Sequence, residues 1–212
     1  MISEELIERL KGAFDKELPG MESHLKMTPF RKMTNDIPEN RREGAVMMMI
    51  YPKNGELYFP LIQRQEYKGV HSNQVSFPGG KVEEFDENLY YTALRETEEE
   101  IGINKAEINK IGEMSQIYIP PSNFLVSAFL TFHQELPQFI KEEKEVKEIL
   151  EIPVSSVLDS NNIKSTKVEI GNGQKLTTPY FDLHEKVVWG ATAAILSEFK
   201  AIFNGLTNDI ID

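Results

Sequence analysis

The sequence predicts an α+β fold, with a mixed β-sheet between helices. Two observations lead to this prediction. Short runs of β-branched, aromatic and methionine side chains recur along the chain and end at turn residues, which is typical of strands. Helical spacing of apolar residues occurs in only a few segments, and these do not alternate regularly with the strands. The pattern therefore favours a mixed-sheet sandwich over a regularly alternating α/β fold.

The first helix is predicted over residues 2–17, and a polar, proline-containing connection follows it. Apolar side chains recur in this helix at every fourth position, at Ile2, Leu6, Leu10 and Phe14. The helix could pack on its own domain or on a second subunit of a homodimer, and both alternatives stay open. The length suits one substantial domain or two small ones, and we expect one domain at 44–212, with the helix and connection of 1–43 packed on it.

Residues 45–52 and 56–64 are the next predicted elements, both strands, and the Asn-Gly pair at 54–55 is a strong signal for a tight hairpin between them. The three methionines at 47–49 are expected to be buried strand residues. A short strand over 74–80 then runs into a Pro-Gly-Gly turn. Glycines at such a turn let the backbone approach a ligand closely.

A second helix is predicted to begin after Asp86, a suitable N-cap, and to end before Gly102, which suits the left-handed position that follows a helix. Its buried face is expected to consist of Leu89, Ala93, Leu94, Thr97 and Ile101.

The rest of the chain supplies further strands, predicted at 108–114, 124–133, 167–170 and 180–184, with a Gly-Asn-Gly turn at 171–173. The acidic stretch 141–150 is predicted to form a short helix. A last helix is predicted over 187–203, and Trp189 lies on its apolar stripe, so we expect this side chain in the core.

Bulk composition excludes several classes of function. The net charge of −11 leaves no basic field for nucleic acid. The chain has no cysteine, and hence no disulfide, thiolate metal site or cysteine nucleophile. Its apolar runs are too short to cross a bilayer, and its charged N-terminus lacks the apolar core of a secretory signal. We expect a cytoplasmic protein that binds neither nucleic acid nor membrane. A small anionic substrate fits this charge if a bound metal reverses its sign locally.

Four glutamates crowd into five positions of the second predicted helix, at Glu96, Glu98, Glu99 and Glu100. At about 100° per residue, three of them share one face, and Glu98 points away. Carboxylates that converge in a partly buried place repel one another strongly unless a cation lies between them. Such oxygen clusters suit hard divalent cations, here Mg²⁺ or Mn²⁺. The alternative is a solvated acidic face with Arg95 as counter-charge.

A longer pattern surrounds these glutamates, with the members Gly80, Glu87, Arg95, Glu96, Glu99, Glu100 and Gly102. It resembles the signature of the Nudix hydrolases, and residues 80–103 correspond to the Nudix box. Two positions differ from that signature. Six residues rather than five separate Gly80 from Glu87, and Thr97 stands where an aliphatic residue is usual.

The stretch "LIQRQEYKGVHSNQVSFPGG", residues 61–80, is similar to the coenzyme A pyrophosphatase-like group of that family. The six-residue spacing is itself typical of this group, whereas Gly69 and Asn73 stand where the group has Arg and Gly. The resemblance implies the Nudix fold, an α/β/α sandwich. It also implies hydrolysis of a nucleoside diphosphate derivative, first of all coenzyme A or its thioesters, to phosphopantetheine and an adenosine bisphosphate.

The resemblance further implies roles for single residues. Metal ligands would be Glu96, Glu99, Glu100 and the carbonyl oxygen of Gly80. Glu87 and Arg95 would form a supporting ion pair that holds the loop against the helix. The general base would be Glu99 or, from a distant loop, Glu145, for which an exposed helical glutamate is the alternative.

Substrate contacts are expected from Arg64, His71, Gln74 and Lys81. A surface ion pair is the alternative for Arg64, and a structural role is the alternative for His71. The substrate could also be another nucleotide, such as ADP-ribose, NADH or a dinucleoside polyphosphate. A catalytically silent Nudix-fold binding module is a third possibility, although such proteins usually lose the Glu-Glu pair, which is intact here. Nudix-related isoprenoid diphosphate isomerases need a catalytic cysteine, which this chain lacks.

Overall fold

The computed structural model describes residues 2–29, 36–66, 73–169 and 175–208. The helices are α1 (Glu4–Phe14), α2 (Gly20–Leu25), α3 (Leu89–Ile101), α4 (Val154–Leu158) and α5 (Gly190–Asn208). The strands are β1 (Arg42–Lys53), β2 (Glu56–Arg64), β3 (Val75–Ser76), β4 (Gly79–Lys81), β5 (Asn109–Glu113), β6 (Ile117–Ile119), β7 (Phe124–Phe132), β8 (Val146–Pro153), β9 (Ile163–Glu169), β10 (Lys175–Leu183) and β11 (Lys186–Val188). Three short 3-10 turns, at Lys105–Glu107, Pro120–Ser122 and Ser160–Asn162, complete the elements.

The large sheet is mixed, as the sequence predicts. Its main order is β3-β2-β1-β7-β5, while β4 pairs with β1, β6 with β7, and β8 with β2. The central strand β1 runs antiparallel to β2 and parallel to β7. The hairpin between β1 and β2 turns at Asn54 and Gly55, which both have positive φ, of 53° and 83°. That conformation fits a tight turn between twisted strands and confirms the hairpin prediction.

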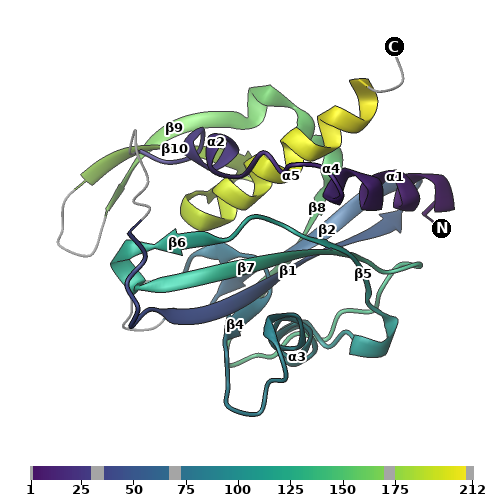
Figure 1. Cartoon of the computed structure of the whole chain (residues 1–212), viewed down its shortest axis with the longest axis horizontal. Helices are drawn as coiled ribbons and strands as arrows, with labels where there is room; N and C mark the ends of the chain where they lie inside the picture. The colour runs from purple at the N-terminus through teal and green to yellow at the C-terminus, as the bar shows by residue number, and fades with distance from the viewer. Residues whose placement is uncertain (1, 30–35, 67–72, 170–174, 209–212) are drawn as a thin grey trace.

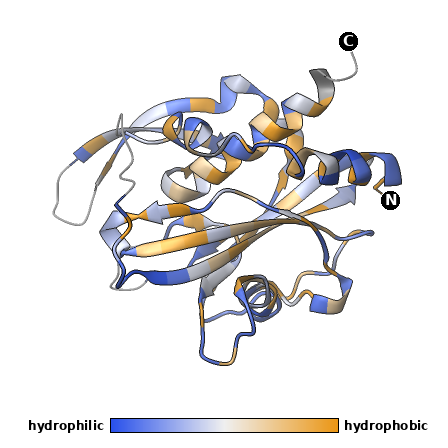
Figure 2. Ribbon diagram, viewed as in Figure 1, coloured by the Kyte–Doolittle hydropathy of each residue, from blue (hydrophilic) through white to orange (hydrophobic). Residues whose placement is uncertain are grey.

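Both faces of the large sheet are covered, which explains the methionine run in β1. Side chains alternate across a strand. Met48 therefore packs in the core under α5, while Met47 and Met49 pack in a second core against α3, and all three are fully buried. Figure 1 shows α3 on one side of the sheet and α5, α1 and α2 on the other. In Figure 2 the hydrophobic colour follows β7 between these layers.

Helix α1 packs on its own chain. Ile7 and Leu10 are buried in the core under α5, and the helix contacts β5 and α5. The fit against β5 is close, because a Cβ atom added to Gly112 would lie 2.3 Å from Cγ of Phe14. The apolar face of α1 is thus covered without a second subunit.

Three expectations about the later elements are wrong. The acidic stretch 141–150 is not helical: it forms a turn that runs into β8, whose pairing with β2 overrides the local helical pattern. Val187 belongs to β11, and α5 begins only at Gly190. Trp189 lies between these two elements and is half-buried instead of lying in the core. The turn predicted at 171–173 lies outside the described residues.

A buried carboxylate ties the N-terminal segment to α5. Glu198 has a fully buried side chain, and His24 on α2 lies 2.9 Å from its Oε2. The backbone N–H groups of Gly20 and Ser115 donate to its Oε1, at 3.2 and 3.3 Å. Burial raises the pKa of Glu198, but the hydrogen bonds from His24 and Ser115 outweigh burial and lower the pKa overall. The carboxylate therefore stays charged and joins three separate segments.

We expect Glu198→Ala to lower the free energy of unfolding by about 3 kcal/mol, because it leaves His24 and two N–H groups without their partner. Glu198→Gln should cost less, since its Oε1 can still accept from both N–H groups. Urea unfolding of the two variants beside the wild type measures this. Loss of less than about 0.5 kcal/mol in both variants would contradict the account.

Candidate functional site

Helix α3 carries the glutamate cluster, and its ends fix the position of that cluster. Asn88 is the N-cap, because its side-chain oxygen accepts from the N–H of Tyr91 at 2.9 Å. The prediction of Asp86 as N-cap is therefore wrong by two residues. Gly102 ends the helix with φ of 73°, as predicted, and its N–H donates to the carbonyl of Glu98. Thr97 is buried, and its hydroxyl donates to the Ala93 carbonyl at 2.7 Å, which satisfies it inside the helix.

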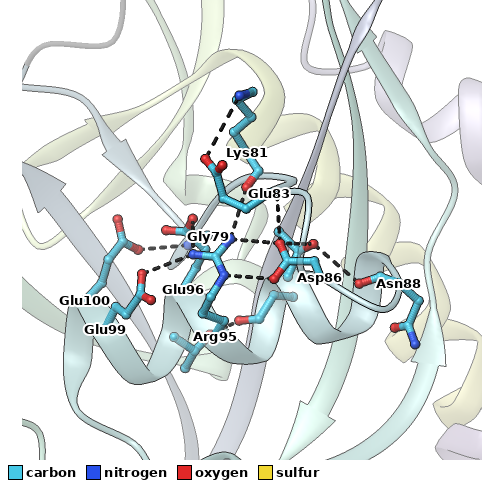
Figure 3. Close-up of polar contacts among 12 residues, drawn as sticks. Gly79, Lys81, Glu83, Asp86, Asn88, Arg95, Glu96, Glu99 and Glu100 are labelled. Carbon is cyan, nitrogen blue, oxygen red and sulfur yellow. Dashed lines mark hydrogen bonds and ion pairs between the residues drawn. The ribbon is translucent and has the colours of Figure 1, made fainter.

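Glu96 and Glu100 face the turn between β3 and β4 (Figure 3). A Cβ atom on Gly80 would lie 2.4 Å from the carboxyl carbon of Glu96, so a side chain there would displace this carboxylate. Glu100 is 1% exposed. One of its carboxylate oxygens accepts from the N–H of Gly79 at 2.8 Å, and the other lies 3.2 Å from the Arg64 guanidinium.

The other two glutamates are more accessible. The side chain of Glu99 is 58% exposed and lies 3.1 Å from Arg95. Glu98 points elsewhere and lies 3.7 Å from Lys105. The sequence prediction that Glu98 stands apart from the other three is thus confirmed.

The electrostatics of the face favour a cation. Burial raises the pKa of Glu100 to about 8, against the pull of Arg64 and the Gly79 N–H, and the charges of Glu96 and Glu145 add to the rise. Burial also raises the pKa of Glu96, and Glu99 and Glu145 contribute in the same direction. These carboxylates are therefore close enough to destabilise one another's charge.

The acidic segment before β8 is docked on the C-terminal end of α3. The N–H of Ile140 donates to the Ile101 carbonyl at 2.9 Å, and the N–H of Glu142 donates to the Glu100 carbonyl at 3.0 Å. A side chain at Gly102 would block this approach, since a Cβ atom there would lie 2.6 Å from Cβ of Ile140. The docking brings Glu145, which is exposed and not helical, to the edge of the glutamate face.

Arg95 is the counter-charge of the site, and its main partner is Asp86. The guanidinium donates twice to the fully buried Asp86 carboxylate, at 2.9 Å each, and also to Glu96 at 2.8 Å and to the Lys81 carbonyl at 3.1 Å. The hydrogen bonds from Arg95 hold the pKa of Asp86 well below its usual range.

The predicted ion pair between Glu87 and Arg95 is therefore wrong. Glu87 is exposed and has no ion-pair partner in the described part of the chain. Five residues separate Gly80 from Asp86, which is the usual spacing of the signature, so Asp86 takes the position in space that the sequence reading gave to Glu87. The five-residue spacing points to Asp86, although the signature has a glutamate at that position.

The carbonyl of Gly80 does not face the glutamates. Gly80 pairs with Ala45 on β1, and its carbonyl oxygen lies against Gly44, 2.7 Å from the place of an added Cβ. The Lys81 carbonyl, by contrast, faces α3 and accepts from Arg95. Carbonyl directions alternate along a strand, so Gly79 offers its oxygen on the α3 side. Of these two carbonyls, that of Gly79 is therefore the one directed toward α3.

The predicted substrate contacts are only partly brought together. The Arg64 side chain lies at the site, where it forms an ion pair with Glu100. The backbone N–H of Arg64 donates to the carbonyl of Gln74 at 3.0 Å. Lys81 is exposed at the loop, 4.0 Å from Glu83. His71 lies outside the described residues.

Comparison with known proteins identifies the architecture. The sequence profile of the NUDIX domain matches residues 41–169, which is more than half of the chain. The chain belongs to the Nudix family. A Nudix relative, the mitochondrial coenzyme A diphosphatase NUDT8 of Homo sapiens, is 33% identical over 132 residues, 62% of this chain. The chain spans only 56% of the length of NUDT8.

Other Nudix proteins match over more of their length. The uncharacterized Nudix hydrolase NudL of Shigella flexneri is 30% identical over 79% of this chain and 86% of its own. A Caenorhabditis elegans Ap4A hydrolase, in a binary complex, has a TM-score of 0.52 at 15% identity, over 77% of this chain and 98% of its own. A MutT/nudix family protein of Enterococcus faecalis has a TM-score of 0.53 at 16% identity, over 98% of this chain and 76% of its own. These structures support the Nudix fold, and among the described helices none is long and apolar enough to span a membrane.

The Nudix helix fits a hard divalent cation in its donor chemistry. As the side chains stand, no three acidic, His or Cys side chains of the described residues enclose a metal position. Oxygens of Glu96, Glu99 and Glu100 form ion pairs with Arg95 and Arg64 and therefore do not converge on one point. All the donors are oxygens, Gly80 leaves room beside Glu96, and burial disfavours the bare charge of Glu100. A cation would relieve that burial cost.

We expect Asp86→Ala to weaken Mn²⁺ binding at least about tenfold, because Arg95 then turns fully onto Glu96 and Glu99 and competes with the metal. Glu87→Ala is the matched control and should leave the Kd unchanged within about twofold. Calorimetric titration with Mn²⁺, without substrate, gives both values. A larger effect of Glu87→Ala would restore the pairing first predicted from the sequence.

The raised pKa of Glu100 leads us to expect that the free energy of unfolding depends on pH when EDTA keeps the protein free of metal. In the folded chain the carboxyl group of Glu100 has a pKa of about 8, whereas an ordinary glutamate has a pKa near 4.5. Because the folded state binds more protons between these values, the free energy of unfolding should fall as the pH rises through this window. Denaturant unfolding of the wild type and Glu100→Gln at several pH values tests this. The stability difference between them should change across the window, and a constant difference would refute the assignment.

Proposed function

We propose that this Nudix protein is a metal-dependent hydrolase that cleaves the diphosphate of a nucleoside diphosphate derivative, with coenzyme A or its thioesters as the favoured substrate. The observation that carries the proposal is the acidic face of α3. There, Glu96 and the buried Glu100 lie beside the glycine turn and under the charge of Glu145. A chain without a use for a cation has little reason to bury mutually repelling carboxylates in this way.

Glu96, Glu99, Glu100 and the Gly79 carbonyl would hold Mg²⁺ or Mn²⁺. Bound there, the cation would neutralise phosphate oxygens and lower the pKa of a bound water. Arg95 would then keep its bonds to Asp86 and the Lys81 carbonyl, and so fix the loop on the helix.

The chain also supplies groups for the substrate and the proton. Arg64 would be free to contact a phosphate once Glu100 binds metal, because the two side chains now pair at 3.2 Å. Between the two candidates for the general base, Glu145 is favoured. Glu99 is held by Arg95, whereas Glu145 has no ion-pair partner among the described residues.

The choice of coenzyme A rests on two observations. The relative NUDT8 bears that activity in its name, at 33% identity over part of the chain. The stretch 61–80 also resembles the coenzyme A pyrophosphatase-like group. ADP-ribose, NADH and dinucleoside polyphosphates are the alternative substrates, and a silent binding module is the alternative class. A cytoplasmic location, a homodimer and a domain division at residue 43 stay predictions.

A substrate panel tests the proposal. Formation of the cleavage products, separated by anion-exchange chromatography, would be measured with coenzyme A, acetyl-coenzyme A, ADP-ribose, NADH and diadenosine polyphosphates, each with Mg²⁺, Mn²⁺ or EDTA. We expect metal-dependent cleavage that favours the coenzyme A compounds. Metal-dependent cleavage of another compound would keep the mechanism and replace the substrate. No cleavage of any compound would contradict the proposal and favour the binding module.

We expect Glu99→Gln and Glu100→Gln each to reduce kcat by at least about tenfold, since both remove a negative oxygen from the metal face. Circular dichroism and thermal unfolding should show that both variants remain folded. Glu98→Gln, on the same helix but away from the face, is the matched control and should keep normal turnover. Near-normal rates in both active-face variants would overturn the metal assignment.

A further inference from the structure

A cavity of about 410 Å³ lies between the end of β2, the start of β3, strand β9 and the β11 region. This volume falls within the roughly 300–1,000 Å³ that is usual for small-molecule sites. Val75, Val168 and Val187 give its wall an apolar part, and Trp189 adds an aromatic surface. The cavity is thus lined by the indole ring of Trp189 and a small apolar surface of valine side chains.

Trp189 is positioned by the chain reversal between β11 and α5. Gly190 directly after it has φ of 64°, which turns the backbone out of the strand and into the helix. The indole is half-buried and lines the cavity, so it is neither a core residue nor a freely exposed one. It is also the single tryptophan of the chain.

The polar wall of the cavity is organised in advance. The amide of Gln63 donates to Asn73 at 2.6 Å and accepts from Lys186 at 2.9 Å. Lys186 is fixed in turn by Glu148 at 2.8 Å. Groups held at both ends by protein partners lose little freedom when a ligand binds.

This cavity adjoins the glutamate site along the end of β2. Gln63 lines the cavity, and the next residue, Arg64, forms the ion pair with Glu100. The carbonyl of Gln74, another lining residue, accepts from the Arg64 N–H at 3.0 Å. Because neighbouring side chains alternate across a strand, Gln63 and Arg64 point to opposite faces of the sheet. A ligand that reaches from the cavity to Glu100 would therefore have to turn around the end of β2 at Arg64, whose charge suits a phosphate.

One wall of the cavity lies outside the part of the chain that the family profile covers. The profile ends at residue 169, whereas Lys186, Val187 and Trp189 follow it. Features that the general Nudix domain does not include are suited to select a substrate rather than to perform the shared reaction.

We propose that this cavity is the subsite for the nucleobase of the nucleotide half of the substrate, and that Trp189 is a specificity-determining residue that stacks on the base. The inference rests on the proposed hydrolysis of a nucleoside diphosphate derivative. An aromatic face beside amide side chains is the chemistry that recognises bases, because the ring stacks and amides match the hydrogen-bonding edge. The flexible half of a coenzyme A molecule has no ring for the indole to stack on.

The fluorescence of Trp189 reports directly on this cavity, because no other tryptophan contributes. Titrations in EDTA, where no turnover occurs, would use adenosine 3′,5′-bisphosphate, AMP, 4′-phosphopantetheine and inorganic pyrophosphate. We expect saturable quenching by the two nucleotides alone. Quenching by phosphopantetheine and not by the nucleotides would overturn the proposal and assign the cavity to the other half of the substrate. Absence of quenching by all four would remove the cavity from the substrate site.

Kinetics of variants separates this inference from the proposed function. Trp189→Ala should raise KM about tenfold and leave kcat within about twofold, since stacking on a base is worth about 1–3 kcal/mol. Trp189→Phe, which keeps an aromatic face, should recover most of the lost affinity. Leu136→Ala, at an exposed side chain outside this cavity, is the matched control. A wild-type enzyme that hydrolyses the nucleotide normally while Trp189→Ala has an unchanged KM would refute the subsite and leave the proposed function intact.

Discussion

Repulsion between carboxylates around α3 is the constraint on which the rest of the site depends. Two unit charges about 4 Å apart repel by roughly 4 kcal/mol at an effective dielectric of 20. The fold nevertheless buries Glu100, seats Glu96 over Gly80 and docks Glu145 beside them. Such an arrangement is stable only if a proton on Glu100 or neighbouring positive groups reduce the repulsion. In the protein itself the positive groups are Arg95, Arg64 and the N–H of Gly79.

The scaffold explains how these opposing groups come together. The sheet is covered on both faces, so α3 rests on a rigid core while β4 carries the glycine turn along its side. Gly102 both ends the helix and admits the segment that brings Glu145. Arg95 then joins the loop to the helix through Asp86, and its contacts to Glu96 and Glu99 place a positive charge beside these carboxylates. A divalent cation would exchange with Arg95 for the same oxygens.

Local signals in the sequence predicted what depends on local chemistry. The Asn54-Gly55 turn, the Gly102 helix end and the shared face of Glu96, Glu99 and Glu100 follow from backbone preference and helical geometry. Local sequence patterns predict structure less well where contacts between distant segments determine it. Residues 141–150 have helical charge spacing, yet pairing with β2 makes most of them a turn and a strand. The predicted partner of Arg95 is Glu87, but in the structure its partner is Asp86, one residue earlier in the loop. The apolar pattern around Trp189 predicts a core residue. In the structure its side chain instead lines a cavity that is built by segments distant in sequence.

The most direct test of the metal face is a crystal structure of the protein grown with Mn²⁺, with anomalous diffraction to locate the ion. The account predicts an anomalous peak beside Glu96, Glu100 and the carbonyl of Gly79. It also predicts that Arg95 releases Glu96 and keeps Asp86. A structure without a peak on α3, in which Arg95 still holds Glu96 and Glu99 at saturating Mn²⁺, would contradict the central claim.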